Sequence, residues 1–238
     1  SHNEEKAHYM RMKDVFGKAI TDYFNGINDA DISVHSKDFE DDTIPVHYLF
    51  RDFSEMPKIE QHALQKTKGS VLDVGCGAGS HALYLQEQGH DVLAIDTSEG
   101  AITTCKRRGV VQACQLPFLE VEGTFDTIIL LMNGTGIIGS LQEIPAFFDK
   151  LKSLLSKNGQ VLIDSSDLIY LFDEDDLVQG YYGQMEYKLS YKSIETDWFN
   201  WLFLDKDNLK EEAKLHDFNC DIIYEGEHYD YLAKLTVQ

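Results

Sequence analysis

The sequence predicts an α/β fold with a doubly wound, mostly parallel sheet of seven strands. From residue 69 onward, short β-branched runs alternate with helical runs that end in glycine, which is the rhythm of a parallel sheet. Two final apolar runs, 221–225 and 231–237, are joined by a short turn, so we expect them to close the sheet as an antiparallel pair. With 238 residues, 43% of them hydrophobic, the chain is long enough to bury a core.

The region before the alternating segment predicts two helices separated by a loop. Apolar residues at three-to-four spacing predict an amphipathic helix over 4–24, which an Asn-Gly pair ends. Residues 28–55 are acidic and irregular, so we expect a loop there. A second helix is expected to begin near Pro57, because proline suits a first helical turn, and to end before Gly69.

The alternating region predicts the central strands and helices in order. The expected strands are 71–74, 92–95, 110–113, 125–132 and 161–164. The expected helices are 80–88, 99–108, 145–156 and 209–218. Only residues 114–124 join the third strand to the fourth, whereas a parallel crossover with a helix usually takes a dozen residues or more. We therefore expect the helix of this crossover to be reduced or missing.

An aromatic segment at about 166–205 looks like an insertion after the fifth strand. Residues 185–189 and 198–204 alternate apolar and polar side chains, which predicts a β-hairpin laid over the edge of the sheet. We accordingly divide the chain into an N-terminal helical cap and loop, 3–68, and a main domain, 69–238, that carries the insertion.

The charge of the chain excludes two classes of partner. The formal net charge is −20, so a nucleic-acid backbone and an anionic membrane surface would both be repelled over most of the protein. The longest strongly apolar stretch, 127–132, is far too short to span a bilayer. We therefore expect a soluble protein that binds neither nucleic acid nor membrane.

The cysteines and histidines predict neither disulfides nor a metal site. The four cysteines form no C-x-x-C pair, and the nine histidines show no metal-binding spacing. The chain also opens without a basic stretch followed by an apolar run, which a secretory signal would need. These features predict a cytoplasmic protein without a metal ion.

A glycine-rich turn joins the first predicted strand of the sheet to the helix that follows, in the sequence VLDVGCGAGS at 71–80. Gly75, Gly77 and Gly79 occupy alternate positions directly after the strand. Glycine lets a ligand approach the backbone closely, and a tight turn alone would not need three of them. The turn therefore predicts a nucleotide-like ligand.

Two carboxylates indicate which ligand this is. Asp73, beside the glycines, would repel a phosphate and attract a cation such as the ammonium or sulfonium of S-adenosylmethionine. Ser80 stands where a dinucleotide fingerprint needs glycine. Asp96 ends the next strand, where it can accept hydrogen bonds from both ribose hydroxyls, although NAD enzymes use such an acid too. Asp96 thus indicates an adenosine-type site, with a capping role as its alternative, and Asp73 selects the cofactor.

These motifs resemble those of the class I S-adenosylmethionine-dependent methyltransferases. Residues 72–79 (LDVGCGAG) are similar to motif I of that family and 94–98 (AIDTS) to its acidic second motif. The resemblance covers 69–164 closely and the rest of the chain in outline. It implies a Rossmann-like methyltransferase fold with a reversed last strand and S-adenosylmethionine as cofactor. The cofactor-binding residues that it implies in the two motifs are Asp73, Gly75, Cys76, Gly77, Gly79, Asp96, Thr97 and Ser98.

The resemblance also implies contacts to the adenine. In the family, the residues after the third strand flank this ring, often with an aspartate. Cys114, Gln115 and Leu116 occupy that place here, and the aspartate is absent. We expect Gln115 to be the residue that hydrogen-bonds the adenine instead.

After the fourth strand, the family aims residues at the methyl group and the substrate. Met132 and Asn133 stand in this position, and Asn133 is the candidate catalytic residue, as a group that orients the substrate. A role in the backbone turn before Gly134 is an equally good interpretation of Asn133. The segment lacks the Pro-Pro-Tyr or Pro-Pro-Phe of the enzymes that methylate amino groups of nucleic acids and glutamine. This absence favours a small-molecule substrate.

Candidate substrate residues come from two segments. Tyr170 and Trp198 belong to the aromatic insertion, which is interpreted either as a substrate lid or as packing for the added hairpin. His47, Tyr48 and Arg51 belong to the N-terminal loop and are candidates for the opposite wall. Arg51 would bind an acidic group of the substrate, or else form a surface ion pair.

The sequence as a whole predicts an enzyme that transfers a methyl group from S-adenosylmethionine to a small molecule, by in-line attack on the sulfonium methyl. Two alternatives are also compatible with the sequence. One is a non-catalytic module that binds S-adenosylmethionine, and the other is an NAD-dependent oxidoreductase.

Overall fold

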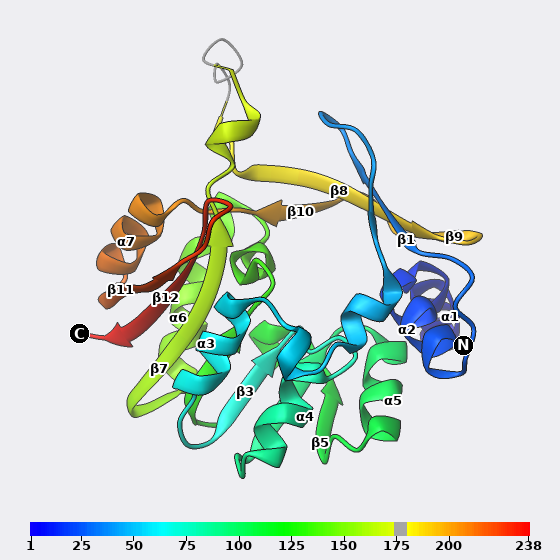
Figure 1. Cartoon of the computed structure of the whole chain (residues 1–238), viewed down its shortest axis with the longest axis horizontal. Helices are drawn as coiled ribbons and strands as arrows, with labels where there is room; N and C mark the ends of the chain where they lie inside the picture. Colours follow the sequence, from blue (N-terminus) through cyan, green and yellow to red (C-terminus); the bar gives the residue numbers. More distant parts are fainter. Residues whose placement is uncertain (174–179) are drawn as a thin grey trace.

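The computed structural model describes residues 1–173 and 180–238, and its main sheet follows the predicted topology (Figure 1). In spatial order, the strands of this sheet are β11 (Phe218–Glu225), β12 (Asp230–Val237), β7 (Leu155–Ser166), β6 (Phe125–Leu130), β3 (Val71–Val74), β4 (Val92–Asp96) and β5 (Gln112–Gln115). Strands β7 to β5 pair in parallel, whereas β12 is antiparallel to both of its neighbours. This confirms the seven-stranded, mostly parallel sheet with a reversed last strand.

Helices cover both faces of the main sheet. They are α3 (Lys58–Lys66), α4 (Ser80–Glu87), α5 (Glu99–Arg108), α6 (Ile144–Leu154) and α7 (Lys206–Leu215). Buried side chains of α3, α4 and α5 form one core with the sheet, and those of α6 and α7 form a second core on the opposite face. The sheet is therefore enclosed between two helical layers, as the doubly wound prediction requires.

The third strand and the crossover that follows it can be compared with the prediction in detail. The third strand begins at residue 112 and not at 110, because Gly109 caps α5 in the left-handed conformation and the amide of Val110 donates to the carbonyl of Cys105. The crossover from β5 to β6 contains only a single helical turn, η3 (Phe118–Glu120), which confirms the expected loss of its helix.

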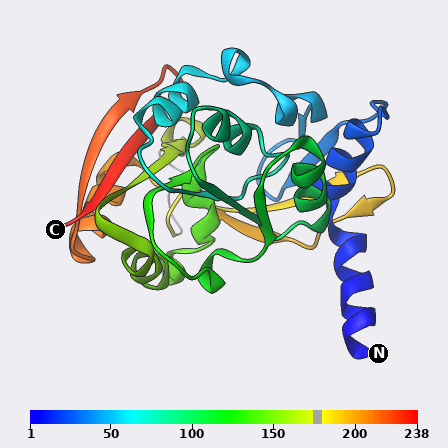
Figure 2. The same ribbon diagram turned by 90° about the horizontal axis from the view of Figure 1, so that it is seen from below.

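The predicted helix over 4–24 is wrong in one respect, because it is interrupted at Asp14. The chain forms α1 (His2–Lys13) and α2 (Val15–Phe24), and α1 buries no residue and extends away from the body of the molecule (Figure 2). The Asp14 carboxylate accepts a hydrogen bond from the amide of Gly17 at 2.9 Å and another from the amide of Gly100 at 3.1 Å. Asp14 therefore caps the N-terminus of a new helix, although the apolar spacing continues through this residue.

The loop expected over 28–55 is also wrong, because this segment contributes two strands to a second sheet. Its elements are β1 (Ile32–Ser36), β2 (Asp42–Ile44), η1 (Val46–Phe50) and η2 (Phe53–Glu55). They join β8 (Gln184–Tyr191), β9 (Ile194–Glu195) and β10 (Phe199–Leu202) from the insertion. The order is β10-β8-β1-β2, with β9 paired to β8, and all pairs are antiparallel. No local period reveals β1, because its partner β8 lies far away along the chain.

The second sheet lies over the carboxyl ends of the parallel strands of the main sheet (Figure 1). The antiparallel pair of β8 and β10 confirms the predicted hairpin, although residues 174–179 of the insertion lie outside the described ranges. Helix α2 packs between the two sheets, against β8 on one side and α5 on the other. Within the described ranges, none of the helices has both the length and the apolar character needed to cross a membrane.

The close crossing of α2 and α5 allows a test of this arrangement. A Cβ atom on Gly100 would lie 2.5 Å from the carbonyl oxygen of Gly17, so Gly100→Ala should force the two helices apart. We expect a loss of about 1–3 kcal/mol in the free energy of unfolding, the usual range for overpacking. Urea denaturation measures the loss. Thr103→Ala, at an exposed position of the same helix, is the control and should change the free energy by less than about 0.5 kcal/mol. Equal stabilities of the two variants would contradict the close crossing.

Candidate functional site

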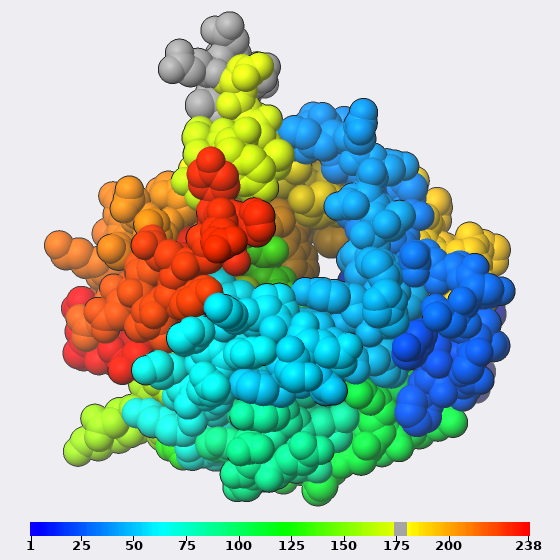
Figure 3. Space-filling model, viewed as in Figure 1, coloured from blue at the N-terminus to red at the C-terminus, as the bar shows by residue number. Residues whose placement is uncertain are grey.

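A cavity of about 1570 Å³ lies between the carboxyl edge of the main sheet and the second sheet. The space-filling view shows the surface hollowed between β8 and the segment that precedes α3 (Figure 3). Pockets for one small ligand usually measure about 300–1,000 Å³. The cavity therefore has room for two ligands, one on the main sheet and one beneath the second sheet.

The glycine turn after β3 forms part of the cavity floor. Gly75 and Gly77 line the cavity with φ values of +70° and +54°, which favour glycine. A Cβ atom on Gly77 would meet nothing within 4 Å, so this position faces open space that a ligand can fill. Gly79 does not line the cavity, contrary to expectation, because it packs against α5, where a Cβ atom would lie 2.9 Å from the Cys105 sulfur. Cys76 lines the cavity and contacts the same sulfur at 3.7 Å.

Asp96, at the end of β4, joins the glycine turn after β3 to the loop that precedes α5. One of its carboxylate oxygens accepts a hydrogen bond from the amide of Gly77 at 2.9 Å, and the other accepts one from the amide of Ser98 at 2.9 Å. Burial raises the pKa of Asp96, and these two hydrogen bonds oppose the rise. Each carboxylate oxygen keeps a second lone pair, so Asp96 can still accept ribose hydroxyls. Thr97 and Ser98 line the cavity beside it, and the Ser98 hydroxyl also caps α5.

Asp73 is the most unusual charged residue of the site. Its side chain is only 2% exposed, and its Oδ2 atom has no hydrogen-bond partner. Burial raises the pKa of Asp73 to about 6, with the nearby Asp96 raising it further and His81 lowering it. A buried carboxylate oxygen without a partner is costly, so this atom marks the place of a ligand donor.

A buried ion cluster lies beside Asp73 and includes residues that the sequence did not suggest. Glu60 on α3 pairs with the guanidinium of Arg51 and lies 2.6 Å from the Nε2 atom of His81. Burial alone would raise the pKa of Glu60, but His81 and Arg51 together hold it below its usual range. The Arg51 side chain is 5% exposed and lines the cavity, and its Nε donor has no partner.

The two unpartnered groups have opposite charges. Among the described residues, the buried side-chain atoms without a hydrogen-bond partner are Arg51 Nε, Asp73 Oδ2 and Thr104 Oγ1, and the residues of the first two line the cavity. A buried cationic donor and a buried anionic acceptor that line the same cavity match the carboxylate and the ammonium of an amino acid. The methionine part of S-adenosylmethionine carries both groups, so these residues fit that cofactor.

The turn after β6 brings Met132 and Asn133 to the cavity in a strained conformation. Their φ values are 64° and 59°, which are uncommon for residues other than glycine. The buried carboxylate of Asp164 accepts a hydrogen bond from the amide of Gly134 at 2.9 Å and so holds this turn, while burial raises the pKa of Asp164 to about 7. Asn133 accepts a hydrogen bond from the Ser166 hydroxyl at 2.8 Å. Asn133 therefore forms the turn and lines the cavity as well.

The residues expected around the adenine are only partly brought to the cavity. Gln115 and Leu116 line it, and the side-chain amide Nε2 of Gln115 donates to the backbone carbonyl of Thr97 at 3.2 Å. Cys114 does not line the cavity, because successive side chains of a strand point to opposite faces.

Of the five expected substrate residues, only Arg51 lines the cavity. His47 is exposed, and the Tyr48 ring lies 4.2 Å from the Arg51 guanidinium, outside the cavity lining. Tyr170 is 52% exposed and stacks on Tyr229 with ring centroids 4.7 Å apart. The Trp198 ring is 40% exposed and lies beneath the ammonium groups of two lysines on the outer side of the second sheet.

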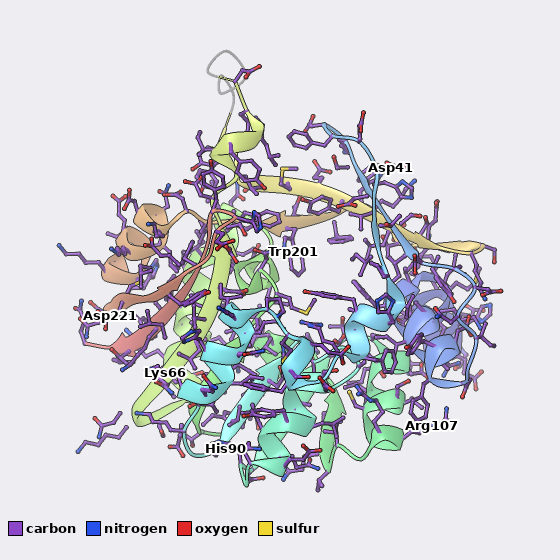
Figure 4. All side chains as sticks on the ribbon, in the orientation of Figure 1. Asp41, Lys66, His90, Arg107, Trp201 and Asp221 are labelled. Atoms are coloured by element: carbon purple, nitrogen blue, oxygen red, sulfur yellow. The ribbon has the colours of Figure 1, made fainter. Side chains whose placement is uncertain are left out.

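Other aromatic residues of the insertion form the roof of the cavity. The roof side chains of β8, β10 and the residue after β10 are Met185, Tyr187, Leu189, Phe199, Trp201 and Phe203. Trp201 projects from β10 toward the main sheet (Figure 4). The period of two in this segment places Phe199 and Trp201 on one face and Trp198 on the other. This alternation is the sequence signal that distinguishes the roof residues Phe199 and Trp201 from Trp198.

Comparison with known proteins identifies the family. The family described as "Methyltransferase domain" matches residues 46–222. The crystal structure of an S-adenosylmethionine-dependent methyltransferase from Bacteroides fragilis, in complex with S-adenosylhomocysteine, is 46% identical in sequence, with a TM-score of 0.91 over 95% of both chains. The chain is an S-adenosylmethionine-dependent methyltransferase. This assignment replaces the alternative of an NAD-dependent oxidoreductase.

Two curated relatives agree with the assignment. An uncharacterized methyltransferase of Staphylococcus carnosus is 23% identical over 236 residues, which cover 95% of this chain and all of the relative. A Geobacillus protein described as a methyltransferase is 28% identical over 114 residues. That match covers 45% of this chain and 46% of the relative, so the chain spans less than half of the length of this second relative.

The raised pKa of Asp73 predicts how cofactor binding by this methyltransferase depends on pH. The ionised carboxylate would attract the cofactor ammonium, so the affinity for S-adenosylmethionine should fall as the pH drops through about 6. Asp73→Asn should bind more weakly at neutral pH and should lose this pH dependence. Calorimetric titrations between about pH 5 and about pH 7.5 measure both effects. An unchanged pH dependence in the variant would assign the titration to another group.

Proposed function

We propose that this methyltransferase acts on a small molecule, which binds in the part of the cavity beneath the second sheet. The observation that carries the proposal is the composition of the roof: apolar and aromatic side chains of β8 and β10 face the same cavity as the glycine turn. Such an apolar and aromatic wall with polar groups at defined places is typical of small-molecule sites. The net charge of −20 also disfavours a nucleic-acid substrate.

The floor of the cavity supplies the groups that would hold the cofactor. We assign Asp96 to the ribose hydroxyls, and Arg51 and Asp73 to the carboxylate and ammonium of the methionine part. Gly77 provides open space beside the backbone. Leu116 and Gln115 are assigned to the adenine. Because the side-chain nitrogen of Gln115 already donates to a backbone carbonyl, its side-chain oxygen would accept the hydrogen bond from the adenine.

When bound, S-adenosylmethionine supplies a methyl group activated by the adjacent sulfonium, which a nucleophile attacks in line. The chain contributes orientation, an effect that can reach about 7–11 kcal/mol in favourable cases. Asn133 and Met132, fixed by the Asp164 hydrogen bond, stand at the boundary between floor and roof and would orient the acceptor. Trp201 and Phe199 would exclude water from the reacting groups.

The roof is fixed to the main sheet, so the chamber has a defined shape. The Thr135 hydroxyl lies 2.6 Å from the Ser165 hydroxyl and donates to the carbonyl of Leu202 at 2.8 Å, which links β10 to β7. A Cβ atom on Gly136 would lie 1.8 Å from the Trp201 ring, so the ring sits directly on this glycine. Both contacts hold Trp201 above the turn that carries Asn133.

The assignment of Asp96 predicts a specific loss of cofactor affinity. Asp96→Ala removes the hydrogen bonds to the ribose, so the affinity for S-adenosylmethionine should fall by about 1.5–3 kcal/mol, or roughly 10- to 150-fold in Kd. Isothermal titration calorimetry measures this change. Asp91→Ala, an exposed position just before the same strand, is the matched control and should keep the wild-type affinity. A normal affinity of Asp96→Ala would contradict the assignment.

The proposed substrate class is tested with a labelled methyl group. The protein is incubated with methyl-labelled S-adenosylmethionine and a metabolite extract that has been freed of macromolecules. We expect the label in a product of low molecular mass, formed together with S-adenosylhomocysteine, and we expect much less product with Asp96→Ala. If the label entered only nucleic acid or protein in a parallel incubation with whole lysate, the small-molecule proposal would be wrong. A complete lack of transfer would favour the non-catalytic binding module.

A further inference from the structure

The two faces of the second sheet differ in the number of charged side chains that they carry. The strand residues of this sheet that line the cavity are Val34, Ser36, Asp42, Ile44, Met185, Tyr187, Leu189, Phe199 and Trp201. Asp42 is the one acidic residue in this set, which contains no basic residue. On the outer face, Glu186 pairs with Lys37 at 2.8 Å, and Lys188 pairs with Glu195 at 3.6 Å. The cavity side is therefore an apolar and aromatic surface that carries one carboxylate.

The register of the strands places this carboxylate on the same face of the sheet as the aromatic roof, two strands away from β8. Asp42 is opposite Val34, and Val34 is opposite Leu189, so these three side chains form one row across the cavity face. The next row contains Tyr187, which is opposite Phe199. Burial and the charges of Tyr170 and Asp42 raise the pKa of Tyr187 to about 12, which keeps its hydroxyl neutral. A carboxylate and the face of a neutral tyrosine thus lie in neighbouring rows.

The aromatic rings of the roof meet one another at steep angles. The centroids of Phe199 and Trp201 are 6.4 Å apart with planes at 80°, and those of Tyr187 and Phe203 are 6.4 Å apart, also at 80°. In such an edge-to-face pair only one face of one ring is covered by the other ring, and all four rings also line the cavity. A flat apolar group or a cation can therefore contact them.

The cations that line the cavity already have acidic partners. Arg11 pairs with Glu99 at 2.9 Å, and Lys13 pairs with Asp197 at 3.3 Å. Arg51 pairs with Glu60, which also forms a hydrogen bond with the His81 ring. An anionic acceptor would find these charges neutralised, with only the Arg51 Nε donor remaining, which we assign to the cofactor.

Asp42, in contrast, has its charge available to a ligand. Among the hydrogen bonds of the described residues, its carboxylate accepts one from the amide of its neighbour Thr43, at 2.8 Å. Glu40 and Asp41 precede it and line the cavity too, so the rim near Asp42 is negative. Charge complementarity at this rim favours a positively charged ligand.

We infer that the methyl acceptor is a small molecule with a flat apolar body and a protonated amine, whose ammonium group is held by Asp42 and the face of Tyr187 while its body lies against Trp201 and Phe199. This inference rests on the proposed function, which assigns the chamber to the acceptor. The ammonium is an anchoring group in this account. Its contacts are an ion pair with a carboxylate and a cation–π contact, which reinforce each other in a partly enclosed site.

Three probes of nearly the same shape test the charge of the ligand. They are 1-naphthylmethylamine, 1-naphthalenemethanol and 1-naphthoate, which are cationic, neutral and anionic at neutral pH. Calorimetric titration into protein saturated with S-adenosylhomocysteine measures their affinities. We expect the amine to bind at least about 10-fold more tightly than the carboxylate. We also expect its affinity, but not that of the alcohol, to fall with added salt.

Two charge-removing variants locate the effect. Asp42→Asn should reduce the preference for the amine to less than about threefold, without changing the affinity for the alcohol. Glu186→Gln removes a negative charge from the outer face of the same sheet and should keep the wild-type preference. Both variants should bind S-adenosylhomocysteine as the wild type does, which shows that they are folded.

The outcomes separate this inference from the proposed function. Equal or tighter binding of the carboxylate, no binding of any probe by protein that binds S-adenosylhomocysteine, or an unchanged preference in Asp42→Asn would overturn the inference and leave the proposed function standing. If the wild-type protein bound neither S-adenosylmethionine nor S-adenosylhomocysteine, the proposed function would fail, and the inference with it.

Discussion

The site depends on one electrostatic constraint: a carboxylate and a guanidinium are buried at the carboxyl edge of a parallel sheet, and each keeps one polar atom without a partner. Asp73 Oδ2 and Arg51 Nε are both sequestered from water, and burial raises the pKa of Asp73 to about 6. A fold without a ligand would gain nothing from this arrangement, because an unpaired buried polar group is destabilising. The Glu60 and His81 side chains limit the cost by neutralising the rest of the cluster. We therefore propose that the arrangement is a preformed receptor for a zwitterion.

The remainder of the fold places two different environments on either side of this receptor. The glycine turn and the Asp96 hydrogen bonds shape a polar floor that suits a nucleoside. The second sheet shapes an apolar roof, and it is assembled from segments before and after the main sheet in the sequence. Helix α2 and the hydroxyl contacts of Thr135 hold this roof in place. The methyl transfer would thus occur at the boundary of a polar and an apolar environment, with water excluded from the apolar side.

The sequence predicted what is determined by local interactions. The helix at 99–108 has the expected boundaries because Ser98 and Gly109 cap its two ends, and the strand at 71–74 ends where expected because Gly75 begins the turn. The sequence could not predict β1, whose pairing with β8 depends on contacts between distant segments. The family resemblance implies Gly79 as a cofactor residue, yet this glycine packs against Cys105, which a sequence motif does not reveal. Trp198 was chosen for its residue type, whereas the period of two along the strand shows that Phe199 and Trp201 are the roof residues.

The pKa of Asp73 itself tests the central claim most directly. Carbon-13 NMR of the labelled carboxyl group, assigned with Asp73→Asn, can follow its titration with and without S-adenosylhomocysteine, which has the ammonium of the methionine part but not the sulfonium. The account predicts a pKa of about 6 in the free protein and a clear fall when the ligand binds, because its ammonium stabilises the ionised carboxylate. The same pKa in both states would show that Asp73 does not contact the cation, and the electrostatic basis of the site would be wrong.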